Sequence, residues 1–328
     1  MVNRQEITAF FHQLKSIPFV QTYLQNCYLK HEYQDSERLS FENADRFIYY
    51  LEHAETYLQQ AKNVPISIQP VLLFYGMTQL IKTCLLTVRP HYPENTSLLA
   101  HGVSTRKRKK QSYLFLQDEV KIQQNGLFPY FTNHLFDIQQ LPKDKFSMNS
   151  LYKRIPEMND LFQVDSKENE QFKIGHYQEG KLQIPEEILN EWHISESRFI
   201  QKINMLIPQA TEVNLKSEKF SIDLSYPLYP FESNTLYLNM DDQHYYLMKN
   251  RQYTYPFHEV MAHFLLLYNL SMICRYETEW WGELLHTYGS NDYPFILHFL
   301  NITAKKTPIM LGYYLYNQNE KHNRYSLQ

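Results

Sequence analysis

The sequence predicts a mainly α-helical protein with a smaller β-containing middle, an α+β fold whose helical bundle core is formed by the N- and C-terminal thirds. Two long apolar segments of helical length, residues 70–88 and 258–274, lie on either side of shorter strand-like segments. Glycine contributes only 8 of 328 residues, too few for a sandwich built on tight hairpins. We expect one α-rich domain over residues 1–328, with an N-terminal helical part (1–105), a mixed middle (106–250) and a C-terminal helical part (251–328).

The N-terminal part predicts two packed helices. Apolar residues three or four apart over Phe41–Lys62 are typical of a helix buried on one side. Pro70 suits the first turn of the next helix, which ends at Arg89 because the following proline disfavours helical backbone. This second helix is apolar nearly all round, and Gln79 and Lys82 inside it favour a buried core helix over a membrane span.

The middle predicts strands, and the C-terminal part predicts helices. Tyr113–Ile122 is strand-like, Phe172–Ile184 resembles a hairpin turning at Glu179-Gly180, and a second hairpin is expected around Asp241-Asp242. Helical spacing returns over Pro185–Leu206 and again from His258 to Cys274. Pro294–Leu300 and Pro308–Tyr316 predict two short closing helices, each begun by proline.

Composition excludes several classes of protein. A hydrophobic content of 43% excludes wholesale disorder, and a net charge of −3 gives no global attraction to nucleic acid or membranes, so such a partner needs a local patch. The three cysteines are far apart and form no CxxC pair, which supports neither a disulfide framework nor a zinc site. We expect no cofactor, no metal and no membrane partner, and a cytoplasmic location, because the N-terminus lacks the apolar core of a signal peptide.

Several long strings resemble the bacterial YaaC-like family. They are FIYYLEHAETYLQQA, QPVLLFYGMTQLIKTCLLT, LLAHGVSTRKRKK, NGLFPYF, LLLYNLSMICRYETEWWGELL and DYPFILHFL. The likeness covers most of the chain. It implies a bacterial cytosolic protein without an established activity, and therefore no catalytic residue to carry over.

The N-terminal helices also resemble, more distantly, the core of HEPN domains. The resemblance rests on Tyr49–Ala54 and Tyr75–Leu86, followed by His101-Gly102. It implies an RNA-cleaving pair, an arginine and a histidine separated by four to six residues.

Arg46 and His53 have the HEPN spacing, as do Arg251 and His258. In HEPN ribonucleases the motif lies at the start of a later helix, whereas Arg46 and His53 fall in the middle of an early one. The resemblance makes Arg46, His53 and His101 the catalytic candidates of a metal-independent ribonuclease.

A second histidine pair resembles a zinc-protease motif but fails its spacing. His258 and His263 are five residues apart, whereas HExxH needs four to place both imidazoles on one helix face. We therefore expect no zinc site here, and interpret Glu259 as an acid at the helix start and His263 as a core histidine, with a Glu259–His263 pair as the alternative.

Cationic and aromatic side chains supply the binding candidates. Five consecutive cations could hold phosphates or form a solvated loop; they are Arg106, Lys107, Arg108, Lys109 and Lys110. Arg275, Trp280 and Trp281 combine residue types that anchor binding pockets, with a salt bridge from Arg275 to Glu277 or Glu279 as the structural alternative. Lys82, in an apolar helix, must find a partner, lose its charge or extend to the surface.

Together these features predict a regulatory module that binds a nucleotide, RNA or a protein, without catalysis of its own. The first alternative is the HEPN-type ribonuclease. The second is an assembly component, such as a homodimer formed through a tyrosine-rich helical face. Convergence of Arg106–Lys110, Lys82 and Arg275 on one surface would favour the binding module.

Overall fold

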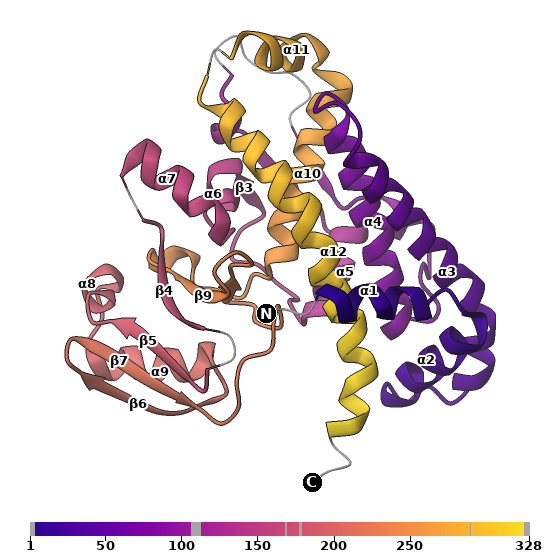
Figure 1. The fold of residues 1–328 in the computed structure, drawn as a ribbon, viewed down its shortest axis with the longest axis horizontal. Helices are drawn as coiled ribbons and strands as arrows, with labels where there is room; N and C mark the ends of the chain where they lie inside the picture. Colours follow the sequence, from indigo (N-terminus) through magenta and orange to yellow (C-terminus); the bar gives the residue numbers. More distant parts are fainter. Residues whose placement is uncertain (1–3, 106–112, 168, 177–178, 289, 325–328) are drawn as a thin grey trace. The chain divides into compact units, whose positions relative to one another are not determined.

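The structure is a computed structural model that describes residues 4–105, 113–167, 169–176, 179–288 and 290–324. Its contacts divide the chain into two compact units. Unit 1 contains Tyr152–Glu259, and unit 2 contains the segments before and after it, residues 3–151 and 260–328. The mainly helical fold with a smaller β part is confirmed (Figure 1), whereas the single domain stays a prediction.

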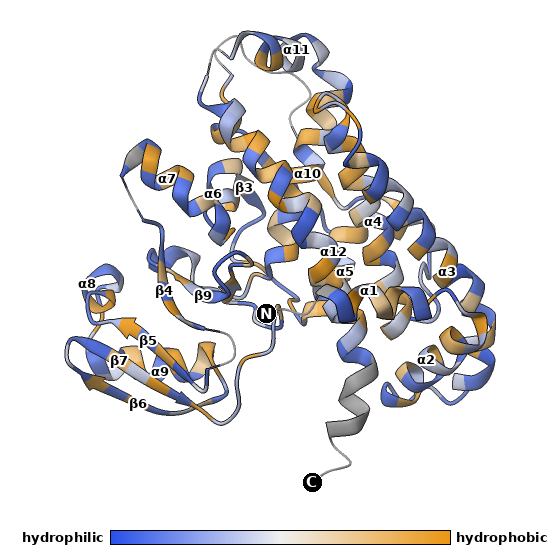
Figure 2. Cartoon of the chain, in the orientation of Figure 1, coloured by the Kyte–Doolittle hydropathy of each residue, from blue (hydrophilic) through white to orange (hydrophobic). Residues whose placement is uncertain are grey.

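Unit 2 is a helical bundle. Its long helices are α1 (Arg4–Gln13), α2 (Ile17–Lys30), α3 (Ser36–Ala61), α4 (Gln69–Val88), α10 (Glu259–Tyr276), α11 (Thr278–Thr287) and α12 (Asp292–Arg324). The two predicted N-terminal helices exist as α3 and α4, which pack side by side, and α12 packs against α4 (Figure 1). Hydrophilic residues follow the outer side of α3 in Figure 2, as the one-sided apolar spacing predicts.

Two helices form the apolar centre of unit 2. Among the described helices, α4 is the one long and apolar enough to cross a membrane, yet 72% of its apolar window is buried inside the protein. Every residue of α10 from Val260 to Ser271 is buried. Cys84 and Cys274 lie on these helices and Cys27 on α2, all as free thiols.

The prediction of two short closing helices is wrong. α12 runs without a break from Asp292 to Arg324 with Pro308 inside it. Proline cannot donate the main-chain hydrogen bond of a helix interior, but Thr307, Met310 and Leu311 are buried around it. Tertiary packing of both flanks therefore outweighs the local preference to end the helix.

A small sheet and a helix complete unit 2. Strands β1 (Val103–Thr105), β2 (Glu119–Ile122) and β3 (Lys145–Ser147) pair antiparallel in that order, and α5 (Leu127–Phe136) connects β2 to β3. The predicted strand Tyr113–Ile122 is only partly correct, because residues 115–117 form a 3-10 helix. The main-chain N–H groups of Phe115 and Leu116 donate to the buried carboxylate of Asp292 instead of to a strand.

Unit 1 contains two three-stranded sheets with short helices. Their strands are β4 (Gln171–His176), β9 (His244–Met248) and β8 (Leu236–Leu238) in one sheet, and β5 (Lys181–Pro185), β7 (Lys219–Leu224) and β6 (Ala210–Lys216) in the other. The remaining helices are α6 (Met148–Tyr152), at the boundary, and α7 (Asn159–Ser166), α8 (Ile188–Trp192) and α9 (Glu196–Leu206). The predicted helical run Pro185–Leu206 is thus two helices, interrupted at His193, whose φ is +50°.

One predicted hairpin of unit 1 is confirmed and the other is wrong. β8 and β9 pair around Asp241-Asp242, with Leu236 opposite Leu247. β4 and β5 exist near their predicted positions, but β4 pairs with β9 and β5 pairs with β7. Apolar alternation is a local property of each strand, whereas the choice of partner depends on distant segments.

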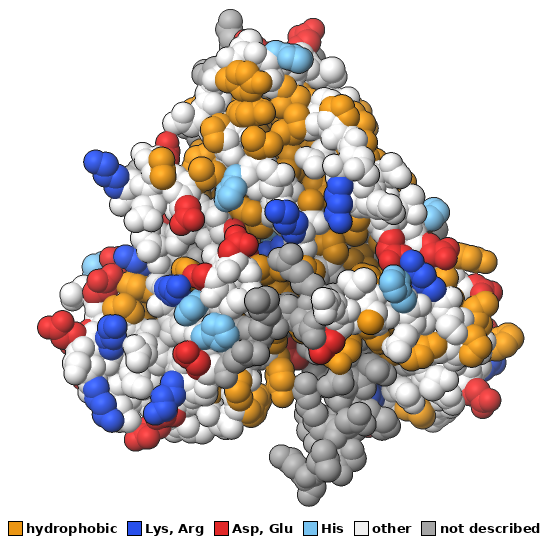
Figure 3. Space-filling view, viewed as in Figure 1, with side chains coloured by type: hydrophobic (Ala, Val, Ile, Leu, Met, Phe, Trp, Pro, Cys, Tyr) orange, Lys and Arg blue, Asp and Glu red, His pale blue; other side chains and the backbone are white. Residues whose placement is uncertain are grey.

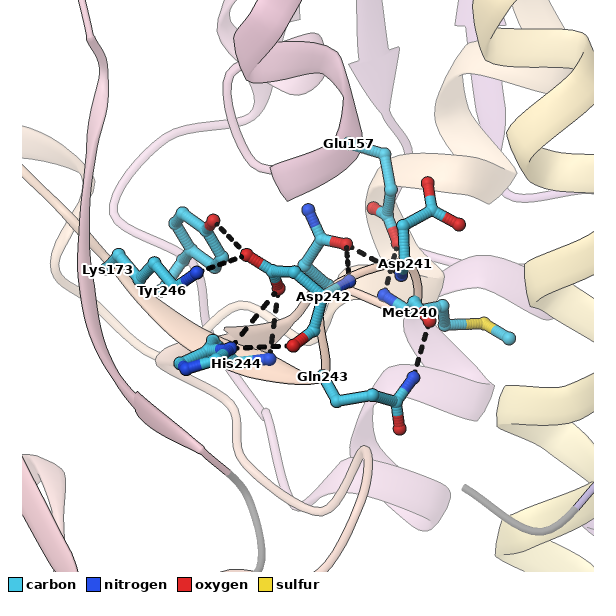
Figure 4. A network of polar contacts seen from close by, with 9 residues as sticks. Glu157, Lys173, Met240, Asp241, Asp242, Gln243, His244 and Tyr246 are labelled. Carbon is cyan, nitrogen blue, oxygen red and sulfur yellow. Dashed lines mark hydrogen bonds and ion pairs between the residues drawn. The ribbon is translucent and has the colours of Figure 1, made fainter. Parts of the chain in front are cut away.

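The β8–β9 turn is held by the carboxylate of Asp242 (Figure 4). This carboxylate accepts from Lys173 Nζ at 2.9 Å, from the Tyr246 hydroxyl at 2.7 Å and from the main-chain N–H of His244 at 3.0 Å. Partial burial alone would raise the pKa of Asp242, but these hydrogen bonds outweigh it and hold the pKa below its ordinary value.

Asp242→Asn should therefore destabilise the protein at pH 7 by about 1 kcal/mol. This is less than for a fully buried carboxylate, because the side chain of Asp242 is 32% exposed and solvent screens its charge. A depressed pKa stabilises the fold above the unfolded-state pKa of about 4, and this contribution disappears as pH falls through the folded value. Urea unfolding should show a larger difference from wild type at pH 7 than at pH 2.5. Exposed Asp241 provides the control Asp241→Asn, and an equal loss at both pH values would contradict the assignment.

Candidate anion-binding site of unit 2

Three cationic or protonatable side chains of unit 2 lie near one another although they are far apart in sequence. Lys82 comes from α4, His101 from the loop before β1, and Arg275 from the last turn of α10. Both Lys82 and Arg275 act electrostatically on His101. We call Lys82, His101 and Arg275 the cationic cluster.

Helices α4 and α10 each place one tyrosine and one cation of the cluster on the same helix face. On α4, Tyr75 lies seven residues before Lys82, and on α10, Tyr268 lies seven residues before Arg275. Seven residues are nearly two helical turns, so each tyrosine shares a helix face with its cation. The imidazole of His101 lies near both tyrosines, with ring centroids 6.3 Å from Tyr75 and 5.8 Å from Tyr268.

Main-chain contacts place His101 between these helices. The carbonyl of His101 accepts from the N–H of Phe128 at 3.0 Å, at the start of α5. Gly102 and Gly126 both have positive φ, +75° and +122°. A Cβ on Gly126 would lie 2.5 Å from Gly102 Cα, so only glycine permits this approach of two backbones. The His101 loop is therefore held in place by its own backbone packing.

Arg275 is held by neutral groups. Its Nε donates to the Ser271 carbonyl at 3.0 Å and its Nη1 to the Tyr75 hydroxyl at 3.4 Å. The guanidinium also lies 5.2 Å from the ring centroid of Tyr276. Within the described residues no carboxylate pairs with Arg275, so the alternative of a salt bridge to Glu277 or Glu279 is not observed.

Lys82 is half-buried. Its ammonium lies 5.6 Å from the ring centroid of Tyr50, and burial lowers the pKa of its amine. No ion pair joins Lys82 to a carboxylate in the part of the chain that the structure describes. An anion gains most from binding beside a cation that is partly desolvated and has no counter-charge.

The pKa of His101 reflects the local field. Burial lowers this pKa most, and the positive charges of Arg275 and Lys82 lower it further. No described carboxylate acts in the opposite direction. At neutral pH the imidazole is therefore neutral and able to accept a proton, beside two positive charges.

Aromatic side chains of α3 lie next to Tyr75, which contacts two members of the cluster. The Tyr57 ring lies 5.9 Å from Tyr75 at an interplanar angle of 30°, and His53 lies 6.4 Å beyond Tyr57. His53 is exposed, whereas Tyr57 and Tyr75 are half-buried. This part of unit 2 therefore combines positive charge with partly accessible ring surface.

The HEPN-spaced pairs do not form one site. Arg46 donates to the Tyr92 carbonyl at 3.1 Å. His53 lies about two helical turns further along α3, and its ring contacts Tyr57. In unit 1, Arg251 donates to the Trp192 carbonyl and the buried His258 contacts the Phe231 carbonyl. His101, the third catalytic candidate, is the one that lies beside cations.

The other predicted site residues are placed differently. Arg106, Lys107, Arg108, Lys109 and Lys110 lie outside the described residues. Trp281 is buried and its indole N–H donates to the Ser67 carbonyl at 2.9 Å, and Trp280 packs against Tyr113 with ring centroids 4.6 Å apart. Arg275 instead lies over Tyr75 and Tyr276. Tyr75 and Tyr268 are not among the predicted site residues, although each precedes a cation by seven residues, a spacing that places both side chains on one helix face.

The histidines of the near-HExxH segment have separate partners. His263 Nδ1 lies 2.8 Å from Thr303 Oγ1, and His258 Nε2 lies 2.8 Å from the Phe231 carbonyl. The described residues contain no group of three or more metal-ligating side chains. Over the face seen in Figure 3, Lys and Arg side chains are interspersed with Asp and Glu side chains, in keeping with the small net charge.

The fold and this cluster define a mainly α-helical protein whose helical unit holds cationic and aromatic side chains close together. The chain belongs to the YaaC-like family, because the family model described as YaaC-like Protein matches residues 12–315. Comparisons with curated proteins and with solved structures found no match. The HEPN resemblance stays a prediction.

Proposed function

We propose that unit 2 binds a nucleotide, either free or as a unit of single-stranded RNA, and that the protein acts as a regulatory binding module. One arrangement carries the proposal: the Arg275 guanidinium and the His101 imidazole both lie near the ring of Tyr75, at 6.0 and 6.3 Å from its centroid. Lys82 also acts electrostatically on His101, and no described carboxylate pairs with either cation. An anion between these groups would compensate two charges that have no ionic partner among the described residues.

Each side chain suits a different part of such a ligand. The planar guanidinium of Arg275 can donate two parallel hydrogen bonds to a phosphate, and Lys82 can add a compact point charge. The half-buried rings of Tyr57 and Tyr75 offer surface on which a base can stack, a contact worth about 1–3 kcal/mol per base. Phosphate and base are thus recognised by adjacent groups.

Nucleotide binding should strengthen as pH falls. An anion stabilises the protonated imidazole of His101, which carries a third positive charge, so affinity should rise as pH drops from 8 to about 5.5. We expect at least a threefold gain in wild type in the affinity for adenosine 5′-phosphate, once the protonation of the phosphate itself near pH 6 is corrected for. His101→Gln should remove it, and calorimetric titration at several pH values would measure both. An equally steep pH dependence in His101→Gln would assign the proton to another group.

The metal-independent ribonuclease is a second candidate, favoured by one feature of the site. His101 is a neutral imidazole beside two cations, an arrangement that can move a proton while a phosphodiester is held. In that case the purified protein would cleave RNA in EDTA, and His101→Ala would abolish cleavage. Binding of RNA without cleavage supports the regulatory module and removes the ribonuclease.

A further inference from the structure

A cleft of unit 2 has a different chemistry from the cationic cluster. It has a volume of about 820 Å³ and lies between the segment after β2 and the segment before β3, over one side of α5. Five carboxamide side chains line it: Gln123, Gln124, Asn125, Gln139 and Gln140. The volume is within the range of about 300–1,000 Å³ that is usual for ligand pockets.

Main-chain groups on both sides of the cleft take no part in the hydrogen bonding of the sheet. β2 and β3 pair only as far as Lys121 opposite Lys145, followed by one further bond from the Ile122 N–H to the Asp144 carbonyl at 2.8 Å. Beyond that point the two segments separate around the cleft. The N–H groups of Gln124, Asn125, Gln139, Gln140 and Leu141, all described residues, donate to no main-chain carbonyl.

Few charged side chains line this cleft: two lysines, Lys121 and Lys143, and one carboxylate, Asp144. The ammonium of Lys143 lies 5.0 Å from the ring centroid of Phe146. Lys121 lies 3.5 Å from Asp144, so its charge already has a counter-charge. The floor is apolar, formed in part by Phe128, Pro129 and Ile138. A ligand here would meet mainly neutral hydrogen-bonding groups above an apolar surface.

Carboxamides and free main-chain groups together match one class of ligand. Each carboxamide offers a donor and an acceptor without charge, the same pair that a peptide unit presents. An extended peptide presents such pairs along its length and points alternate side chains to one side, here toward the apolar floor. Four or five extended residues span about 13–17 Å at roughly 3.3 Å per residue, a segment short enough for one pocket.

We propose that the cleft between the ends of β2 and β3 binds an extended peptide segment of a partner protein through its main chain. This site is distinct from the cationic cluster and does not depend on nucleotide binding. It assigns to the protein a second binding surface, selective for a neutral backbone rather than for phosphate.

The test uses the full-length protein and an array of acetylated, amidated pentapeptides of random sequence. The strongest binder is then resynthesised with each amide N-methylated in turn, which removes one main-chain donor and leaves the side chains unchanged. N-methylation of at least one central amide should weaken binding about tenfold, as should Gln124→Ala combined with Gln140→Ala. Gln59→Ala combined with Gln117→Ala, exposed glutamines outside the cleft, should leave affinity unchanged.

Three results of the peptide measurements would each overturn the proposal, and a competition experiment provides a fourth. They are the absence of any pentapeptide that binds at 1 mM, binding that is insensitive to N-methylation at every position, and equal affinity in the Gln124/Gln140 variant and wild type. Competition by uncharged nucleosides or oligosaccharides for the peptide would assign the carboxamides to another neutral ligand and would also contradict it. Circular dichroism of both double variants excludes unfolding as the cause of a loss.

Discussion

Replacing Lys82 and Arg275 together by glutamine should weaken the binding of a nucleotide by at least about 100-fold. A hydrogen bond to a charged group contributes roughly 1.5–3 kcal/mol, and every 1.4 kcal/mol is a factor of ten. Because the double substitution removes at least two such hydrogen bonds from one phosphate, the free energy of binding should weaken by about 3 kcal/mol or more. Calorimetric titration with adenosine 5′-phosphate, and fluorescence anisotropy with a single-stranded RNA, would measure it.

The salt dependence provides a second readout of the same substitution. Each phosphate contact adds about 0.7 to the slope of log affinity against log salt for a single strand, so the double variant should have a shallower slope for RNA. The matched control is Lys62→Gln combined with Lys305→Gln, because both lysines are exposed and lie outside the cluster. Equal reductions of affinity in the two double variants would mean that binding follows total charge and not the cationic cluster.

Gly126→Ala should destabilise the protein by about 2–6 kcal/mol and also impair nucleotide binding. Gly126 has a φ of +122°, and a Cβ there would lie 2.5 Å from both Cα and N of Gly102. A side chain adds strain at this φ and forces two backbones apart, and each effect costs roughly 1–3 kcal/mol. Because Gly102 follows His101 directly, the displacement moves one member of the cluster.

The control for this prediction is Gly282→Ala in α11. Nothing lies within 4 Å of a Cβ at Gly282, so alanine should be neutral or should stabilise the helix by up to about 1 kcal/mol. Thermal and urea unfolding of both variants would compare them. A Gly126→Ala protein as stable as wild type would show that the two backbones can separate at low cost, and the position of His101 would lose its structural explanation.

The helices can be predicted because their signals are local. The apolar spacing of Phe41–Lys62 and the apolar run from Pro70 to Val88 correspond to α3 and α4 within a few residues. Strand pairing depends on distant segments, so the predicted pairing of β4 with β5 is wrong. The β6–β7 hairpin has no recognisable signal, because its turn places Ser217 and Glu218 at positive φ, where a sequence pattern would favour asparagine or glycine.

The candidate site is predictable in its residues but not in its grouping. Lys82 stands out because a lysine in an apolar helix needs a partner, and Arg275 because it follows a buried helix beside tryptophans. The sequence cannot show that α4 and α10 present these two cations to His101, since the three residues are joined only by the tertiary fold. It also suggests Trp281 as a ligand contact, whereas the structure places this indole against the Ser67 carbonyl.

The most direct test of the cationic cluster is the pKa of the His101 imidazole, followed by NMR in wild type, Lys82→Gln and Arg275→Gln. In wild type this pKa should lie below its ordinary value of about 6.5, because burial and both cations disfavour the imidazolium. Each single substitution should raise it, and so should saturating adenosine 5′-phosphate. A pKa of His101 that neither substitution nor the nucleotide changes would show that the three side chains do not share one site.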